Sequence, residues 1–129
     1  MSRKPTPHSD DKIILSGLEF YATHGVLEIE KSTKQKFLID ICLYQSLTLP
    51  GRTDDLKLTT DYSKIYETVR NVVENNSFNL IEALANNIAE TIINNFIVDK
   101  ITVTVKKPDA PIAEATFSSI AVQITREKQ

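Results

Sequence analysis

The sequence predicts an α+β domain of two layers, with a four-stranded antiparallel sheet and two helices on one of its faces. Near both ends of the chain, apolar and polar residues alternate with a period of two, which is typical of strands buried on one side. In the middle, apolar residues recur at steps of three and four, which indicates two amphipathic helices. Short connections join the strands of each outer pair, so we expect hairpins. The order ββααββ, with both helices on one sheet face, describes a two-layer domain.

The composition agrees with one ordinary soluble domain. The chain has 129 residues, of which 41% are apolar and 25% charged, and its formal net charge is −2. This balance predicts neither a nucleic-acid partner nor a membrane surface. Residues 1–11 are polar, lack the apolar core of a secretory signal and are expected to be a flexible tail before a single domain at 12–129. Cys42 is the only cysteine, which excludes an intrachain disulfide and favours a cytoplasmic location.

The first two strands are expected at residues 12–21 and 34–49, the first with a bulge at Gly17. In the second strand every other residue is apolar, which predicts one well-buried face formed by Phe37, Ile39, Ile41 and Leu43. Pro50-Gly51 should end this strand, and a loop is expected over 52–60.

Two helices are expected to follow this loop. Asp61 should cap the first, whose apolar stripe begins at Tyr62 and which should end at 75–77. The second helix has a broad apolar stripe and should be heavily buried. Asn79 at its N-cap and Glu82 three residues later fit a capping box, in which each side chain bonds the other residue's backbone N–H.

The last two strands are marked by Ile101, Val103 and Val105, and by Ile120, Val122 and Ile124. With both helices on one face, the sheet would keep two open edges. Such edges are usually covered or paired in soluble proteins. We therefore expect the chain to form oligomers through its sheet edges.

Lys107 is the most informative single residue. Counting by twos from Ile101 places it on the apolar face of its strand, at the strand end before Pro108. Partial removal from water favours the neutral form of a lysine and makes it a better acid–base group at neutral pH. The simpler interpretation is that the strand frays and the side chain extends to water, and the pattern alone favours it. Lys106, on the opposite face, is the natural control.

Four other residues have both a functional and a structural interpretation. Glu82 could accept two hydrogen bonds from a guanidine-like N–H pair, as on a pterin ring, or it could only cap its helix. Tyr62 could carry a proton on its hydroxyl, or it could belong to the core. Glu30 could bind a ligand or be solvated surface, and His24 beside Gly25 could be only a turn residue.

Four segments together resemble the dihydroneopterin aldolase family. They are GLEFYATHGVLEIE (17–30), TDDLKLTTDYSKIYE (53–67), FNLIEALANNIA (78–89) and VTVKKPDAPI (103–112). They occur in the family's order and spacing, and the resemblance extends over 12–126. Two places depart from the usual family pattern, namely 113–117 in the last loop and Ala22-Thr23 before His24.

The resemblance implies the tunnelling fold, in which the sheets of neighbouring subunits join edge to edge in a tetrameric ring. Two rings often stack into an octamer, and active sites lie between subunits. It also implies roles for five residues. Lys107 would be the catalytic acid–base, and Tyr62 would help to bind the substrate and move a proton. Glu82, with the backbone of Ile81, would anchor the pterin ring, and Glu30 would bind its side chain.

The reaction implied by the resemblance is the retro-aldol cleavage of 7,8-dihydroneopterin in folate biosynthesis. The products are 6-hydroxymethyl-7,8-dihydropterin and glycolaldehyde, with C2′ epimerisation as a side activity. The dihydropterin's own imine can take the electrons, so neither a metal nor another cofactor is expected. The closest alternative is the sister enzyme that epimerises dihydroneopterin triphosphate, and a catalytically silent pterin- or purine-binding module is another. A zinc-dependent pyruvoyl-tetrahydropterin synthase is excluded because it needs a histidine triad.

Overall fold

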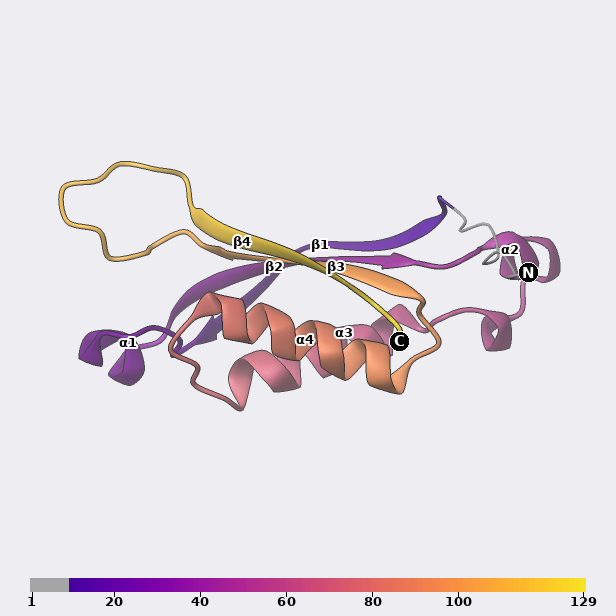
Figure 1. The fold of residues 1–129 in the computed structure, drawn as a ribbon, viewed down its shortest axis with the longest axis horizontal. Helices are drawn as coiled ribbons and strands as arrows, with labels where there is room; N and C mark the ends of the chain where they lie inside the picture. The colour runs from indigo at the N-terminus through magenta and orange to yellow at the C-terminus, as the bar shows by residue number, and fades with distance from the viewer. Residues whose placement is uncertain (1–9) are drawn as a thin grey trace.

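The computed structural model describes residues 10–129, so residues 1–9 of the expected tail lie outside the described residues. The described elements are β1 (Lys12–Ala22), α1 (Glu28–Ser32), β2 (Gln35–Tyr44), α2 (Thr48–Thr53), the 3₁₀ turn η1 (Leu56–Leu58), α3 (Tyr62–Glu74), α4 (Ile81–Asn95), β3 (Lys100–Lys107) and β4 (Ile120–Glu127). The strands form one antiparallel sheet in the order β1-β2-β3-β4. Helices α3 and α4 cover one face of it (Figure 1). The predicted two-layer α+β fold is therefore confirmed.

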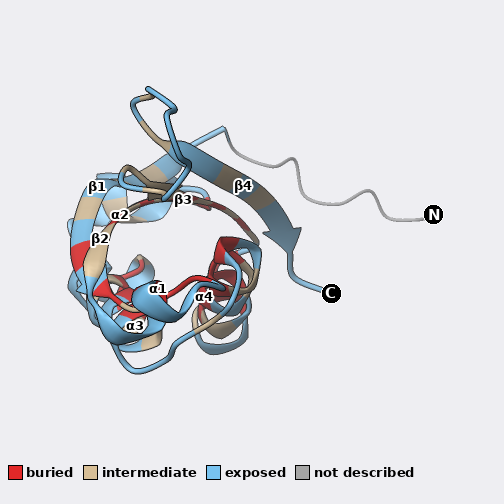
Figure 2. Cartoon of the chain, turned by 90° about the vertical axis from the view of Figure 1, so that its left-hand side faces the viewer, coloured by how far each residue is buried: buried red, intermediate tan, exposed pale blue. Residues whose placement is uncertain are grey.

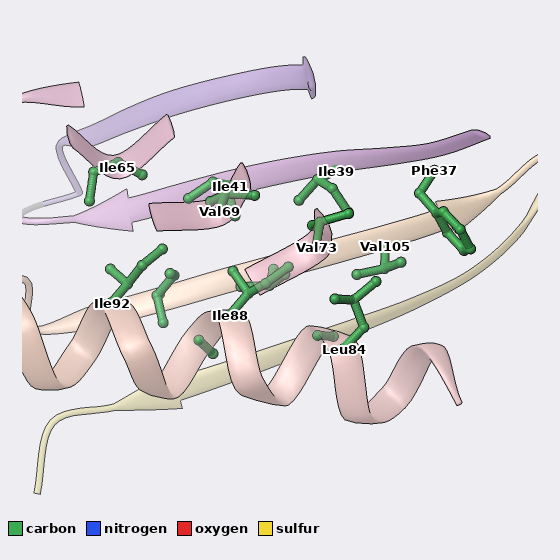
Figure 3. Packing of buried hydrophobic residues seen from close by; sticks show 14 of the residues in the cluster. Phe37, Ile39, Ile41, Ile65, Val69, Val73, Leu84, Ile88, Ile92 and Val105 are labelled. Atoms are coloured by element: carbon green, nitrogen blue, oxygen red, sulfur yellow. The ribbon is translucent and has the colours of Figure 1, made fainter. Parts of the chain in front are cut away.

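The core lies between the sheet and these two helices. The predicted apolar face of β2 points into it, and each of its four side chains is at most 1% exposed. Figure 3 shows three of them, Phe37, Ile39 and Ile41, in one cluster with residues of α3 and α4, namely Ile65, Val69, Val73, Leu84, Ile88 and Ile92. Burying one such side chain contributes about 1.5–3 kcal/mol, so this layer holds the two helices against the sheet.

The predicted bulge in β1 is present at Gly17. The pairing with β2 shifts register between Leu15 and Leu18, and Gly17 has a left-handed φ of +64°. Its backbone N–H donates to Asp40 Oδ1 at 2.7 Å. The other oxygen of Asp40 pairs with Lys106 Nζ at 3.1 Å, on the sheet face away from the helices. Lys106 is therefore held on the outer face.

The region after β2 differs from the expectation. The strand ends at Tyr44 rather than at residue 49, and α2 and η1 occupy most of the expected loop. Asp11 Oδ2 accepts the Leu47 N–H at 3.0 Å, which turns the chain away from the sheet. Pro50 is tolerated in α2 because it lies in the first turn, where a backbone N–H has no helical partner.

The two long helices begin differently. Asp61 caps α3 as predicted, since its carboxylate accepts the Ser63 N–H at 2.9 Å. The capping box predicted for Asn79 and Glu82 is wrong. Helix α4 begins at Ile81 with extended Leu80 at its N-cap and no side-chain cap, so Glu82 is the second helical residue.

The molecule has two distinct ends. Helix α1 and the connection between β3 and β4 lie at one end, and α2 and η1 lie at the other (Figure 1). Figure 2, viewed along the molecule from the α1 end, shows the sheet curving around the helices. In the described part of the chain, no helix has the length and apolar character needed to span a membrane.

Candidate active site

A cavity of about 260 Å³ opens at the α1 end of the molecule. Four of the five residues to which the family resemblance gives roles line this cavity, namely Glu30, Ile81, Glu82 and Lys107. Its apolar wall comes from the last loop and β4, with Ala110, Ile112, Ile120 and Val122. We call the region formed by Glu30, Ile81, Glu82 and Lys107 the lysine end. It combines one cation and two carboxylates in a partly enclosed space.

Lys107 and Glu30 form a close ion pair at the base of this cavity. Lys107 Nζ lies 2.5 Å from Glu30 Oε2, and only 12% and 6% of the two side chains are exposed. The simpler interpretation, in which the strand frays and the lysine extends to water, is therefore wrong. The lysine is held at a fixed position by the Glu30 carboxylate.

Glu30 is held by three donors in all. It is the third residue of α1, where its Oε1 accepts the Leu27 N–H at 3.2 Å, while Gln35 Nε2 donates to Oε2 at 3.1 Å. Burial opposes ionisation of this carboxyl, but the hydrogen bonds from Lys107, Gln35 and Leu27 outweigh it. The pKa of Glu30 is therefore below its ordinary value, and the group is a carboxylate at neutral pH. The sequence placed Glu30 in a loop, and this short helix was not predicted.

Gly25 makes room for the carboxylate. Its φ is +154°, and a Cβ on this residue would collide with all three atoms of the Glu30 carboxyl group. A glycine is therefore required here by space as well as by backbone conformation.

His24 is more than a turn residue. It is fully buried, with Nε2 2.8 Å from the Val73 carbonyl oxygen and Nδ1 accepting the Phe78 N–H at 2.9 Å. Burial lowers the pKa of this imidazole, and the nearby charges of Lys31 and Lys107 lower it further, against the opposing effect of the Val73 carbonyl. His24 is therefore neutral at physiological pH.

The start of α4 lines the same cavity. Glu82 is exposed there, in the first helical turn, where backbone N–H groups lack helical partners and the helix dipole favours an anion. A carboxylate and backbone groups side by side can hold the polar edge of a flat heterocycle by paired hydrogen bonds.

Tyr62 lies toward the other end of the molecule, where α2 and η1 are. It begins α3, is 67% exposed and lines a separate cavity of about 790 Å³ with apolar residues such as Ile14 and Leu56. We call this region the tyrosine end. The alternative that Tyr62 belongs to the core is wrong. Because His24 beside the lysine end contacts Val73, roughly 17 Å along α3 from Tyr62, the two groups do not meet within one chain.

Sequence reasoning missed two residues that support the lysine end. Gln35 donates to both Glu30 and the backbone oxygen of His24, at 3.1 and 3.4 Å. It stands at the start of a strand pattern, where nothing distinguishes it from a surface residue. His24 stands beside a glycine, as turn residues do, and its partners are 49 and 54 residues away.

Comparisons with known proteins point to one family. The family model described as FolB, dihydroneopterin aldolase, matches residues 13–125. A dihydroneopterin aldolase of Bacillus subtilis is 40% identical over 92% of this chain and 98% of its own length, and dihydroneopterin aldolase 1 of Arabidopsis thaliana is 34% identical over 92% and 82%. The E. coli dihydroneopterin aldolase solved in complex with neopterin has a TM-score of 0.83 at 29% identity, covering 90% of this chain and 98% of that one. The chain belongs to the dihydroneopterin aldolase family.

Proposed function

We propose that Lys107, Glu30 and Glu82 of one copy, with Tyr62 of a neighbouring copy, carry out the retro-aldol cleavage of 7,8-dihydroneopterin. The observation that carries this proposal is the buried Lys107–Glu30 ion pair at the base of a cavity whose rim holds Glu82. Membership of the family supplies the reaction, which belongs to folate biosynthesis. We also place the enzyme in the cytoplasm, where the lone Cys42 stays reduced.

Substrate recognition would begin at α4. Glu82 accepts two hydrogen bonds from the ring N–H and the amino group of the pterin, and the backbone of Ile81 bonds the same edge. The apolar wall of Ile112, Ile120 and Val122 packs on the ring. This pose directs the trihydroxypropyl side chain toward Glu30 and Lys107.

The chemistry needs only proton transfers. Lys107, acting through water, removes the proton of the 2′-hydroxyl, and the bond between C1′ and C2′ breaks. Glycolaldehyde leaves with C2′ and C3′, and the bonding electrons pass to the C6–N5 imine as N5 gains a proton. Tyr62 then helps to protonate C1′ while N5 loses its proton, which yields 6-hydroxymethyl-7,8-dihydropterin. Return of glycolaldehyde to the other face before this step would epimerise C2′.

The separation of Tyr62 from Lys107 requires a second copy in this mechanism. Each chain would supply the lysine end of one site and the tyrosine end of another. The apolar surface around Tyr62, including Ile14 and Leu56, which are 63% and 64% exposed, suits contact with a neighbour. The open edges of the sheet would pair at the same time, in a tetrameric ring or in two stacked rings.

The charges of the two cavities favour dihydroneopterin over its triphosphate. Lys107 is the only cation that lines either cavity in the described part of the chain, and Glu30 already neutralises it. Glu82 and Asp61 add negative charge. A triphosphate would meet repulsion here rather than the basic residues it needs.

The first test is an assay with 7,8-dihydroneopterin in excess EDTA, with glycolaldehyde and 6-hydroxymethyl-7,8-dihydropterin followed by chromatography. We expect both at equal rates. Epimers without cleavage would move the chain to the sister activity, and tight pterin binding without reaction would leave a binding module.

The second test asks whether two copies share a site. Lys107→Ala and Tyr62→Phe should each be nearly inactive, but a mixture unfolded and refolded together should regain up to about a quarter of wild-type activity, because that share of sites combines an intact half from each variant. A mixture as inactive as its components would show that the two ends do not act together.

A further inference from the structure

We propose that His24 is a positioning residue for pterin binding, because its imidazole holds the turn before α4, and through it Glu82, against residues 23–25, which follow β1. We call residues 77–80 the anchor turn. The inference rests on the proposed function, which gives Glu82 the task of binding the pterin ring. His24 itself does not line the cavity and is not needed for any proton transfer described above.

The two hydrogen bonds of His24 define its tautomer. The Val73 carbonyl can only accept, so Nε2 carries the hydrogen, and the Phe78 N–H can only donate, so Nδ1 is bare. The ring thus joins the last turn of α3 to the anchor turn. Protonation of Nδ1 would remove the acceptor for Phe78.

Aromatic packing prevents the ring from rotating away. His24 stacks on Phe78 with ring centres 5.6 Å apart and planes 15° from parallel, and it meets Phe37 of β2 edge to face at 5.2 Å. Phe37 is itself fully buried. The imidazole, which is fully buried, therefore packs between Phe37 of the sheet and Phe78 of the anchor turn.

Backbone contacts join the same two segments, residues 23–25 and 77–78, and we call this line of contacts the seam. Gly25 donates its N–H to the Phe78 carbonyl at 2.9 Å, and the Ser77 hydroxyl donates to the Thr23 carbonyl. The residue after Phe78, Asn79, is exposed, and its side chain forms no hydrogen bond within the described residues. Bonds to residues 23–25, together with the burial of Ile81 in the core, thus hold the chain as it enters α4.

His24 and Gly25 also contact the part of the cavity that holds Glu30. The His24 carbonyl accepts from Gln35, which in turn donates to Glu30, and Gly25 lies against the Glu30 carboxylate. The pair His24-Gly25 therefore contacts both the ring-anchoring side and the lysine-bearing side of the site. Loss of the imidazole bonds should loosen the anchor turn first, because Glu30 keeps its bonds to Lys107 and Leu27.

Two substitutions of His24 separate packing from hydrogen bonding. His24→Phe keeps an aromatic ring between Phe37 and Phe78 but removes the acceptor. His24→Asn loses the ring but places an amide oxygen close to the position of Nδ1. For the Phe variant we expect neopterin, followed by its fluorescence, to bind about tenfold more weakly, with a similar rise in KM for dihydroneopterin and kcat within about threefold of wild type. The Asn variant should recover most of the affinity.

Further measurements keep the test independent of folding defects. Val69→Ala removes buried volume at a fully buried position of α3 away from the seam, so it should lower stability without changing neopterin affinity. Ser77→Ala removes one exposed bond of the seam and should weaken neopterin binding in the same direction by a smaller factor. Amide exchange at Phe78, measured by NMR, should be faster in His24→Phe than in His24→Asn.

Three outcomes would overturn the proposal. These are wild-type neopterin affinity in His24→Phe, equal weakening in the Phe and Asn variants, and a loss that falls on kcat rather than on KM. Failure of the proposed function would look different, because the wild-type protein would then not cleave dihydroneopterin, while the neopterin titrations would still report on the seam.

Discussion

The lysine end and the tyrosine end differ in how far a single chain completes them. At the lysine end, the side chains of Lys107 and Glu30 are 12% and 6% exposed and pair with each other, and Glu30 also accepts hydrogen bonds from Leu27 and Gln35. At the tyrosine end, Tyr62 is two-thirds exposed, and its hydroxyl has no bonding partner among the described residues. The fold of one chain thus fixes Lys107 and Glu30 against each other, whereas it leaves the Tyr62 side chain exposed.

The largest expected effect comes from removing the buried amine. Lys107→Ala should lower kcat by roughly 10²–10⁴-fold, as loss of a general acid–base group does, with a modest change in neopterin affinity. Lys106→Ala is the matched control, because Lys106 pairs with Asp40 on the outer face and should keep kcat within about twofold. Steady-state release of glycolaldehyde measures both. Equal, mild effects from the two variants would remove Lys107 from the mechanism.

The next effect concerns binding at the same end. Glu82→Ala should raise KM and the neopterin Kd by roughly 10–100-fold, the size expected when a charged hydrogen-bonding group is lost, and should change kcat much less. Glu90→Ala replaces another exposed acid of α4 and should leave both unchanged. If Glu82→Ala affected kcat alone, the carboxylate would belong to the chemistry and not to the anchor.

A smaller effect should follow from weakening the support of Glu30. Gln35→Met keeps the length of the side chain but removes the N–H that bonds Oε2, so the pKa of Glu30 should rise. The acidic limb of the kcat/KM profile should move to higher pH, with activity at neutral pH lowered a few-fold. Gln123→Met, which removes a bond to Thr104 on the outer face, should leave the profile in place. An unshifted profile in Gln35→Met would mean that Lys107 and the Leu27 N–H suffice to keep Glu30 ionised.

The smallest effect is on stability. The pKa of His24 is below its ordinary value of 6.5 in the folded chain, so the unfolded chain binds more protons near that pH. The free energy of unfolding should therefore fall as the pH drops below about 6.5, by no more than about 1.4 kcal/mol per pH unit for this one group. Glu30, also lowered, acts in a more acidic range, because its contribution is lost only as the pH falls below its ordinary 4.5 toward its folded pKa. Urea unfolding between pH 7 and 5.5 should show the slope in wild type and a shallower one in His24→Phe.

Long periodic segments allowed most of the fold to be predicted. The apolar alternation of β2 and β3 and the stripes of α3 and α4 appear in the structure as one continuous core. The short helices α1 and α2 were missed because five or six residues cannot display a helical period, and Pro50-Gly51 favours a turn.

The candidate site was harder to predict than the fold. Counting by twos along β3 placed Lys107 on the inner face, which is where the structure has it. Nothing local indicates that His24 is buried against Val73 and Phe78, because those contacts depend on how distant elements pack. The predicted capping box failed for a related reason. Phe78 is bonded to His24 and Gly25, Leu80 is extended, and α4 begins one residue later than local preference suggests.

The space above Gly25 also has an evolutionary consequence. Every amino acid that a single base change can substitute for glycine has a Cβ atom, and that atom would occupy the volume of the Glu30 carboxylate. A substitution at this codon would therefore displace the carboxylate, although Gly25 has no side chain and does not line the cavity. The Glu30 carboxylate also holds Lys107, so such a change would reach the ion pair as well.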